Sequence, residues 1–212
     1  MTGGGRRWPP LDGLRAVAVL SVLGYHLYEP HVLPSGYLGV DLFFVLSGFL
    51  ITTGLVDEFD AGGGVVFGRF YVRRALRLLP AALAVVLVAL GLALATLHGD
   101  LRHQTLVGLP WIVLYAGNWA RAVGASSLGV LANLWSLAVE EQFYLLWPVV
   151  LVAFLSRRVA RERLAAALVA LAAVEVAYRE VLFHTGVSVE RLVNGIDTHS
   201  DGLLLGCALA LL

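Results

Sequence analysis

The sequence predicts an all-α protein, a polytopic bundle of transmembrane helices. The 212 residues are 59% hydrophobic and 14% charged, whereas a soluble domain carries about a quarter charged residues. The mean hydropathy of +0.82 is that of a membrane protein. Apolar runs long enough to cross a bilayer recur along the chain, and arginines gather between them.

We expect about six spans in one membrane domain, residues 11–212, preceded by a flexible leader, residues 1–10. A further run, residues 105–119, is short for a spanning helix and contains Pro110, so we expect a re-entrant or interfacial segment there. The expected spans cover residues 11–28, 36–56, 81–97, 133–155 and 164–183, and residues 201–212 are expected to begin a span that the chain does not finish.

Arginine-rich connectors predict the topology. The rule that places positive charge inside puts the leader and residues 69–77 on the cytoplasmic side. If residues 105–119 crossed fully, the arginines of residues 157–163 would lie outside, against the rule, so we prefer the re-entrant alternative. Arg15 and residues 69–77 then lie toward the cytoplasm. The residues expected toward the outer leaflet are His26, Asp41, Glu140, Glu141 and Asp201.

Composition also excludes several function classes. The net charge is zero, so nothing indicates a nucleic-acid partner. Cys207 is the single cysteine, which excludes a disulfide framework and a thiolate metal cluster, and the six histidines show no metal-ligand spacing. All fifteen basic residues are arginine, whose planar fork suits phosphate, although a GC-rich genome favours the same residue usage.

The stretch from residue 133 to residue 148 sets Glu140 and Glu141 side by side within an apolar helix. An ionised carboxylate at membrane depth costs about 2.5–3.5 kcal/mol on insertion scales, so it needs a partner or a function. Ser136, Glu140 and Tyr144 share one helical face by their spacing of four residues. The alternative is a pair of interfacial glutamates in water at a helix end.

Three other patterns carry chemistry. Arg15 and His26 are eleven residues apart, about 16 Å along a helix but only about 20° around it, so they lie on one stripe. Arg69, Arg73 and Arg77 recur every fourth residue and suit a phosphate-rich ligand, although topology alone would also collect arginine there. The pair Ser47-Gly48 permits close helix packing.

Four ordered motifs and a weaker fifth resemble the acyltransferase-3 family of integral-membrane O-acyltransferases. Many members have histidine where Asn133 stands and often arginine where His199 stands. The family usually runs considerably longer, so the last helices are expected to be missing. The motifs are Leu11-Asp-Gly-Leu-Arg15 with His26, Gly36-Tyr-Leu-Gly-Val-Asp41 continuing to Ile51, Phe70-Tyr-Val-Arg73-Arg74-Ala-Leu-Arg77-Leu-Leu-Pro80, Trp135-Ser-Leu-Ala-Val-Glu140-Glu141-Gln-Phe-Tyr144, and Asp201-Gly-Leu-Leu-Leu-Gly206.

The resemblance implies a multi-pass protein of the bacterial cytoplasmic membrane, with a cytoplasmic N-terminus. It would move an acyl group, often acetyl, from cytoplasmic acyl-CoA to a hydroxyl of an extracytoplasmic glycan or glycolipid. Acyl-CoA would be a co-substrate, with membrane lipid around the protein and no bound cofactor or metal.

The resemblance and the residue chemistry also suggest roles. His26 would be the general base, because histidine changes charge near neutral pH, and the acids would fix its tautomer and stabilise the imidazolium. The catalytic candidates are therefore His26, Glu140, Glu141 and Asp41. The candidates for holding the phosphates of acyl-CoA are Arg15, Arg73, Arg74 and Arg77. Acceptor-side or structural candidates are Ser47, Trp135, Ser136, Tyr144 and Asp201.

Other functions stay open at this point. Transfer could be direct, or it could pass through an acyl-enzyme on Ser47 or His26. The buried acids and His26 could instead form the proton relay of a transporter or flippase. The short chain could also be an inactive remnant. The acyl chain, the acceptor and the oligomeric state are not predicted.

Overall fold

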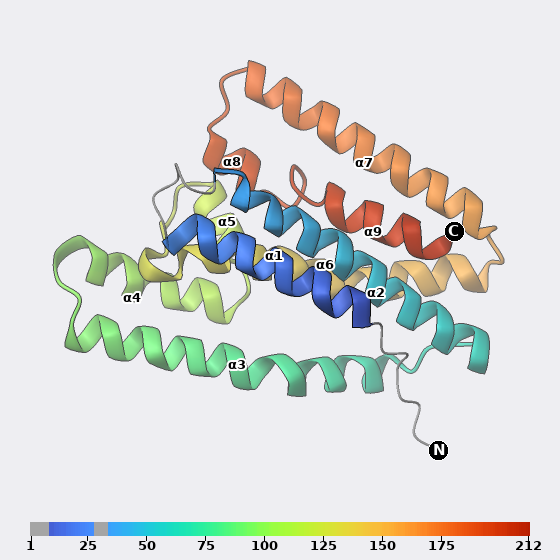
Figure 1. Cartoon of the computed structure of the whole chain (residues 1–212), viewed down its shortest axis with the longest axis horizontal. Coiled ribbons are helices and arrows are strands. Elements are labelled where there is room, and N and C mark those ends of the chain that lie inside the picture. The colour runs from blue at the N-terminus through green and yellow to red at the C-terminus, as the bar shows by residue number, and fades with distance from the viewer. Residues whose placement is uncertain (1–8, 28–33) are drawn as a thin grey trace. The chain divides into compact units, whose positions relative to one another are not determined.

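The computed structural model describes residues 9–27 and 34–212, and within those ranges the chain is 84% helix without strands. The all-α prediction is therefore confirmed, while most of the predicted leader lies outside the described residues. The elements in chain order are α1 (Pro9–Leu27), η1 (Pro34–Tyr37), α2 (Leu38–Gly62), α3 (Phe67–Ala95), α4 (Gly99–Val113), α5 (Gly117–Ala122), η2 (Gly129–Leu134), α6 (Trp135–Ser156), α7 (Arg161–His184), α8 (Val189–Asn194) and α9 (Asp201–Leu211) (Figure 1).

Three segments of the described chain are long and apolar enough to cross a membrane, namely Ser35–Gly62, Phe67–Ala95 and Gly129–Ser156. The expectation of about six spans is thus met only in part. α7 has 24 residues, but charged side chains at both of its ends lower its hydropathy. α9 is a shorter apolar helix of 11 residues.

The contacts divide the described chain into two compact units. Unit 1 holds the described residues up to 63, residues 151–174 and residues 200–212. Unit 2 holds residues 64–150 and 175–199. α6 and α7 each contribute to both units, and the other helices belong to one unit each.

In unit 1, α2 packs against α9 through glycine. A Cβ added at Gly48 would collide with the carbonyl oxygen of Leu203, and one added at Gly206 would collide with that of Val45. Small residues let two helix backbones approach this closely, which is the usual way that membrane helices associate. Gly202 meets Asp41 and Phe44, whereas Cys207 meets Gly48, so α2 and α9 run parallel.

α1 packs on the other end of the same framework. A Cβ at Gly36 would meet Ser21 and Tyr25, and one at Gly39 would meet Ala18. Later residues of α2 therefore meet earlier residues of α1, so the two helices are antiparallel.

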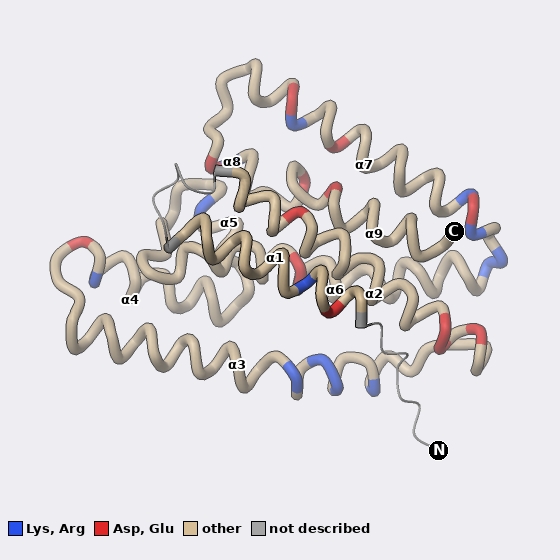
Figure 2. Tube along the Cα trace, viewed as in Figure 1, with Lys and Arg blue, Asp and Glu red and all other residues tan. Residues whose placement is uncertain are grey.

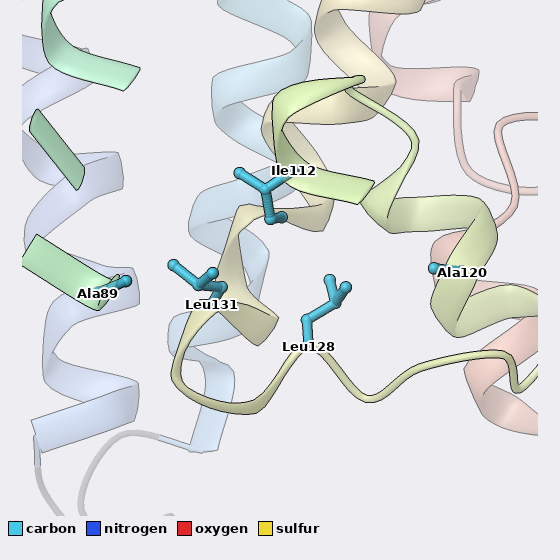
Figure 3. Close-up of a cluster of buried hydrophobic side chains, with 5 residues drawn as sticks. All are labelled: Ala89, Ile112, Ala120, Leu128 and Leu131. Atoms are coloured by element: carbon cyan, nitrogen blue, oxygen red, sulfur yellow. The ribbon is translucent and has the colours of Figure 1, made fainter. Parts of the chain in front are cut away.

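In unit 2, the second half of α3 lies beside α4 and η2 around a small apolar core. Figure 3 shows its five members, contributed by α3, α4, α5, η2 and the turn before η2. The Oγ1 atom of Thr105 donates to Leu101 O (2.7 Å) and accepts from Val130 N (3.3 Å), which ties α4 to η2. The core residues are Ala89, Ile112, Ala120, Leu128 and Leu131.

Residues 105–119 do not form one continuous helix. α4 ends at Val113, Tyr115 has a left-handed backbone with φ 51°, and α5 begins at Gly117. A single continuous helix over this run is therefore excluded, and the re-entrant segment stays a prediction.

An ion pair in unit 1 bears on the side of the membrane to which the arginines of residues 157–163 belong. Arg161 Nη2 lies 2.5 Å from Asp60 Oδ1, so the start of α7 is beside the end of α2. The arginines around residue 161 thus lie at the same end of unit 1 as the connector after α2. This is the side on which a non-crossing segment at 105–119 was expected to place them.

Candidate active site

The predicted site residues fall in both units. Those of unit 1 are Arg15, His26, Asp41, Ser47 and Asp201. Those of unit 2 are Arg73, Arg74, Arg77, Trp135, Ser136, Glu140, Glu141 and Tyr144.

One end of unit 1 collects three of the candidates. His26 is in the last turn of α1, Asp41 is in the first turn of α2, and Asp201 is the first residue of α9. Because α1 is antiparallel and α9 parallel to α2, all three residues lie toward the same end. A Cβ at Gly202 would lie 3.3 Å from Asp41 O, which brings the starts of α2 and α9 together. Within unit 1 the three residues thus share one end, and the side of the membrane on which that end lies stays a prediction.

The His26 ring is oriented by its own helix. Its Nδ1 lies 2.7 Å from Val22 O, and because a carbonyl oxygen can only accept, Nδ1 carries the proton. Nε2 therefore keeps a basic lone pair, on a side chain that is exposed. The Tyr25 ring meets the imidazole edge-on at 5.2 Å. The expectation that a carboxylate fixes this tautomer is wrong: the Val22 carbonyl does so.

Arg15 lies deeper in the unit than expected. Its guanidinium carbon is 6.0 Å from the centre of the Phe43 ring. Phe43 is two residues after Asp41 in α2, and it is 17 residues, or about 25 Å along the helix, before Asp60. Arg15 is therefore not at the Asp60 end, where the topology argument placed it. Its Nε is buried and has no hydrogen-bond partner among the described residues.

Ser47 is only 2% exposed, beside Gly48 in the contact between α2 and α9. The Sγ of Cys207 lies 3.5 Å from Gly48 O in the same contact. This position favours the packing interpretation of the Ser47-Gly48 pair.

In unit 2, Arg74 of α3 forms a bidentate ion pair with Glu141 of α6. Arg74 Nε donates to Glu141 Oε2 (3.2 Å), and Arg74 Nη2 donates to Oε1. The guanidinium also stacks on the Tyr144 ring, 3.3 Å from its centre. The two residues were expected at opposite membrane depths, and this contact contradicts that expectation.

A second contact sets the register of α3 against α6. The hydroxyl of Tyr71 donates to Leu145 O at 2.8 Å. Tyr71 precedes Arg74 while Leu145 follows Glu141, so the two helices are antiparallel here.

Arg69, Arg73 and Arg77 are exposed, in contrast to the partly buried Arg74. Their spacing of four residues gives them a common face, and Figure 2 shows the basic positions confined to the first part of α3. We call these three residues the arginine rail.

The two glutamates of α6 are not in water. Glu140 is 6% exposed, and the Glu141 side chain is 17% exposed against Arg74. The alternative of two solvated interfacial glutamates is therefore contradicted. Ser136, one turn before Glu140, is partly buried.

Gln142, the residue after Glu141, connects α6 to the turn between α4 and α5 through two hydrogen bonds. Its Nε2 donates to Tyr115 O (2.7 Å) and to Asn118 Oδ1 (2.9 Å). Tyr115 is close to the ion pair as well. Burial raises the pKa of its phenol, the Glu141 charge raises it further, and Arg74 opposes the rise.

Sequence reasoning missed a polar cluster built by α5 and α8. Asn118 and Asn194 are both buried there, and Arg121 pairs with Glu190 at 2.8 Å. The Trp135 ring packs on His199 with 5.3 Å between ring centres. Only the aromatic and amide residues in otherwise apolar surroundings could have drawn attention to this cluster.

Unit 2 also contains an apolar cavity of about 710 Å³. It begins at Leu78, directly after Arg77, and its α6 wall ends at Ala138, three residues before Glu141. Tyr115 is one of its lining residues. The others are Leu78, Leu79, Pro80, Ala81, Ala82, Leu83, Val85, Val86, Ile112, Val113, Leu134, Leu137 and Ala138.

Comparison with known proteins identifies the family. The model of the acyltransferase domain matches residues 9–189. The "Putative peptidoglycan O-acetyltransferase YrhL" of Bacillus subtilis is 40% identical over 96% of the chain and 33% of its own length. The "Peptidoglycan O-acetyltransferase OatA" of Listeria monocytogenes is 36% identical over 95% of the chain and 33% of its own length.

The "Putative O-acetyltransferase SAS0844" of Staphylococcus aureus is 37% identical over 98% of the chain and 35% of its own length. The chain thus spans about a third of the length of these curated relatives. No solved structure matches it. The family match and these identities show that the chain belongs to the acyltransferase-3 family of membrane-bound O-acyltransferases.

Proposed function

We propose that the protein transfers an acetyl or related acyl group from acyl-CoA to a hydroxyl of a cell-surface glycan, with peptidoglycan as the first candidate acceptor. The names of the relatives support the reaction and the acceptor. The observation that carries the proposal is the exposed His26 ring, whose Nε2 is left basic by the bond from Nδ1 to Val22.

In the proposed step, His26 Nε2 takes the proton of the acceptor hydroxyl as its oxygen attacks the thioester carbonyl carbon. The carbon–sulfur bond then breaks, the oxygen ester forms, and the imidazolium returns the proton to the departing thiolate. Asp41 lies toward the same end of unit 1 and would stabilise the imidazolium. No covalent enzyme intermediate is needed, and the buried position of Ser47 argues against it as a nucleophile.

The donor would be held by its phosphates. Exposed Arg73 and Arg77 present guanidinium forks on one face of α3, and such forks bind phosphate in pairs of hydrogen bonds. Arg15, which we also predicted as a phosphate contact, belongs to unit 1, and its role toward the donor stays a prediction. Arg74 is already engaged by Glu141, so we move it from phosphate binding to holding the Glu141 side chain in place.

The other assigned roles stay predictions. Glu140 and Glu141 would act as buried acids of unit 2, and the acceptor-side or supporting residues would be Trp135, Ser136 and Tyr144 of unit 2 and Asp201 of unit 1. The protein would lie in the bacterial cytoplasmic membrane with its N-terminus in the cytoplasm, as the positive-inside rule suggests.

Free-thiol release tests this proposal. Protein in nanodiscs is supplied with acetyl-CoA and a peptidoglycan fragment, and wild type is compared with His26→Ala and with His103→Ala, which changes an exposed histidine of α4. We expect acceptor-dependent release in wild type and His103→Ala but not in His26→Ala. Equal release in all three would contradict the role of His26, and no release from wild type would contradict the transferase. Vesicles loaded with a pH dye test the alternative of a proton relay, because a proton transporter would acidify the vesicle interior without consuming thioester.

A further inference from the structure

The apolar cavity of unit 2 lies between the arginine rail and the second half of α3. Its α3 wall runs from Leu78 to Val86, eight residues or about 12 Å along the axis. Its volume of about 710 Å³ is within the range of about 300–1,000 Å³ that small-molecule sites occupy. An acetyl group would fill a small part of it.

The walls restrict the chemistry of an occupant. Thirteen of the fourteen lining residues are apolar, and Tyr115 is the exception. A glycan or nucleotide would lose its hydrogen bonds to water there without replacement, which is costly for each polar group. A hydrocarbon chain loses nothing and gains by leaving water.

The positive charge of the arginine rail indicates the end of the cavity at which such a hydrocarbon chain would enter. The arginine rail starts at Arg69, nine residues or about 13 Å before Leu78, and ends at Arg77 beside the cavity. An anionic head on the rail and an apolar tail in the cavity would therefore match a single extended molecule lying along α3. The Arg74–Glu141 pair lies within the length of the rail, four residues or about 6 Å before the cavity begins at Leu78.

We propose that this cavity holds the acyl chain of the thioester donor, so that the protein accepts linear acyl groups longer than acetyl. The inference rests on the proposed function, because it takes acyl-CoA as the donor on the arginine rail. The phosphates bind the rail, the polar linker passes the Arg74–Glu141 pair, and the chain beyond the thioester enters at Leu78.

Binding of non-reactive thioethers tests the inference without turnover. S-ethyl, S-butyl, S-hexyl and S-octyl coenzyme A are titrated into protein in nanodiscs, with empty nanodiscs as the blank for partition into lipid. Burial of each methylene in the cavity predicts an affinity gain of up to about fourfold per carbon until the cavity is full. Affinity that does not change with chain length would overturn the inference.

Variants of the wall make the test specific. Ala82→Phe should abolish the gain for the hexyl and octyl compounds and leave S-ethyl binding unchanged. Leu83→Ala, at an exposed wall position, should shift the best chain to greater length. Ala95→Phe, exposed at the end of the same helix and outside the cavity, should behave as wild type.

The outcomes separate the two proposals. If S-ethyl binds but longer chains gain nothing, or gain equally in Ala82→Phe, the acyl-chain site is wrong and the transferase proposal stands. If none of the four compounds binds to wild type, the donor assignment fails and the acyl-chain site fails with it.

Discussion

Arg74 of α3 and Glu141 of α6 form a bidentate ion pair, although they are 67 positions apart in the sequence. The Tyr144 ring stacks on the Arg74 guanidinium. The side chains of Arg74 and Glu141 are 24% and 17% exposed, so each charge depends on the other for much of its solvation. The pair therefore gives each charged side chain a partner within an apolar helix bundle, and it fixes α3 against α6.

Removing one member should be more damaging than removing both. Arg74→Ala leaves the Glu141 side chain without its ion-pair partner, and we expect a loss of about 3 kcal/mol of stability. Arg77→Ala, a matched change at an exposed position of the same helix, should stay within about 0.5 kcal/mol of wild type. Thermal unfolding in detergent measures both. The double variant Arg74→Ala/Glu141→Ala should recover part of the loss, and strictly additive losses would mean that the pair does not couple the helices.

The contact between α2 and α9 gives a second prediction. Gly48→Ala should destabilise unit 1 by about 1–3 kcal/mol, because the new methyl group meets the Leu203 carbonyl. Gly54→Ala lies on the same helix with nothing within 4 Å, and it should be neutral or stabilise by up to about 1 kcal/mol. Similar melting temperatures for both variants would show that α9 does not pack on α2 as described.

The Asp60–Arg161 pair predicts a common side of the membrane for its two positions. Asp60→Cys and Arg161→Cys should both react with a membrane-impermeant maleimide from one side of sealed vesicles. Tyr37→Cys, exposed at the end of unit 1 that carries Asp41, should react from the other side. Cys207 is fully buried and contributes no background. Labelling of positions 60 and 161 from opposite sides would overturn the topology.

His26 carries the prediction for the reaction. Replacement by alanine removes a general base, which typically costs about 10²–10⁴ in rate. We expect kcat to fall by this amount while the affinity for S-ethyl coenzyme A and the melting temperature stay close to wild type. A variant that loses affinity and stability instead would assign His26 a structural role.

Local patterns in the sequence predicted the features that depend on neighbouring residues. The spacing of Arg69, Arg73 and Arg77 predicts a shared face because helical geometry is local. The small pair Ser47-Gly48 predicts close packing because small side chains let two helix backbones approach closely. Both are found in the structure.

Local patterns could not predict which residues pair when they are far apart in the sequence. Arg74 is one of several adjacent arginines, and only the rotation of α3 against α6 decides which of them meets Glu141. The hydrogen bond from His26 to Val22 was within reach, because a histidine can return to the carbonyl four residues earlier. A carboxylate partner was expected by analogy with catalytic triads, and the local bond was overlooked. The buried amides of Asn118 and Asn194 depend on the packing of α5 against α8, which no local pattern specifies.

The most direct test follows the acyl group itself. Protein is reconstituted into vesicles, acetyl-CoA with labelled acetyl is added on the side where Asp60→Cys reacts, and a peptidoglycan fragment is placed on the other side. We predict labelled ester on the glycan for wild type and none for His26→Ala. Label recovered only as free acetate, or ester formed equally by the variant, would contradict transfer through His26 to a glycan.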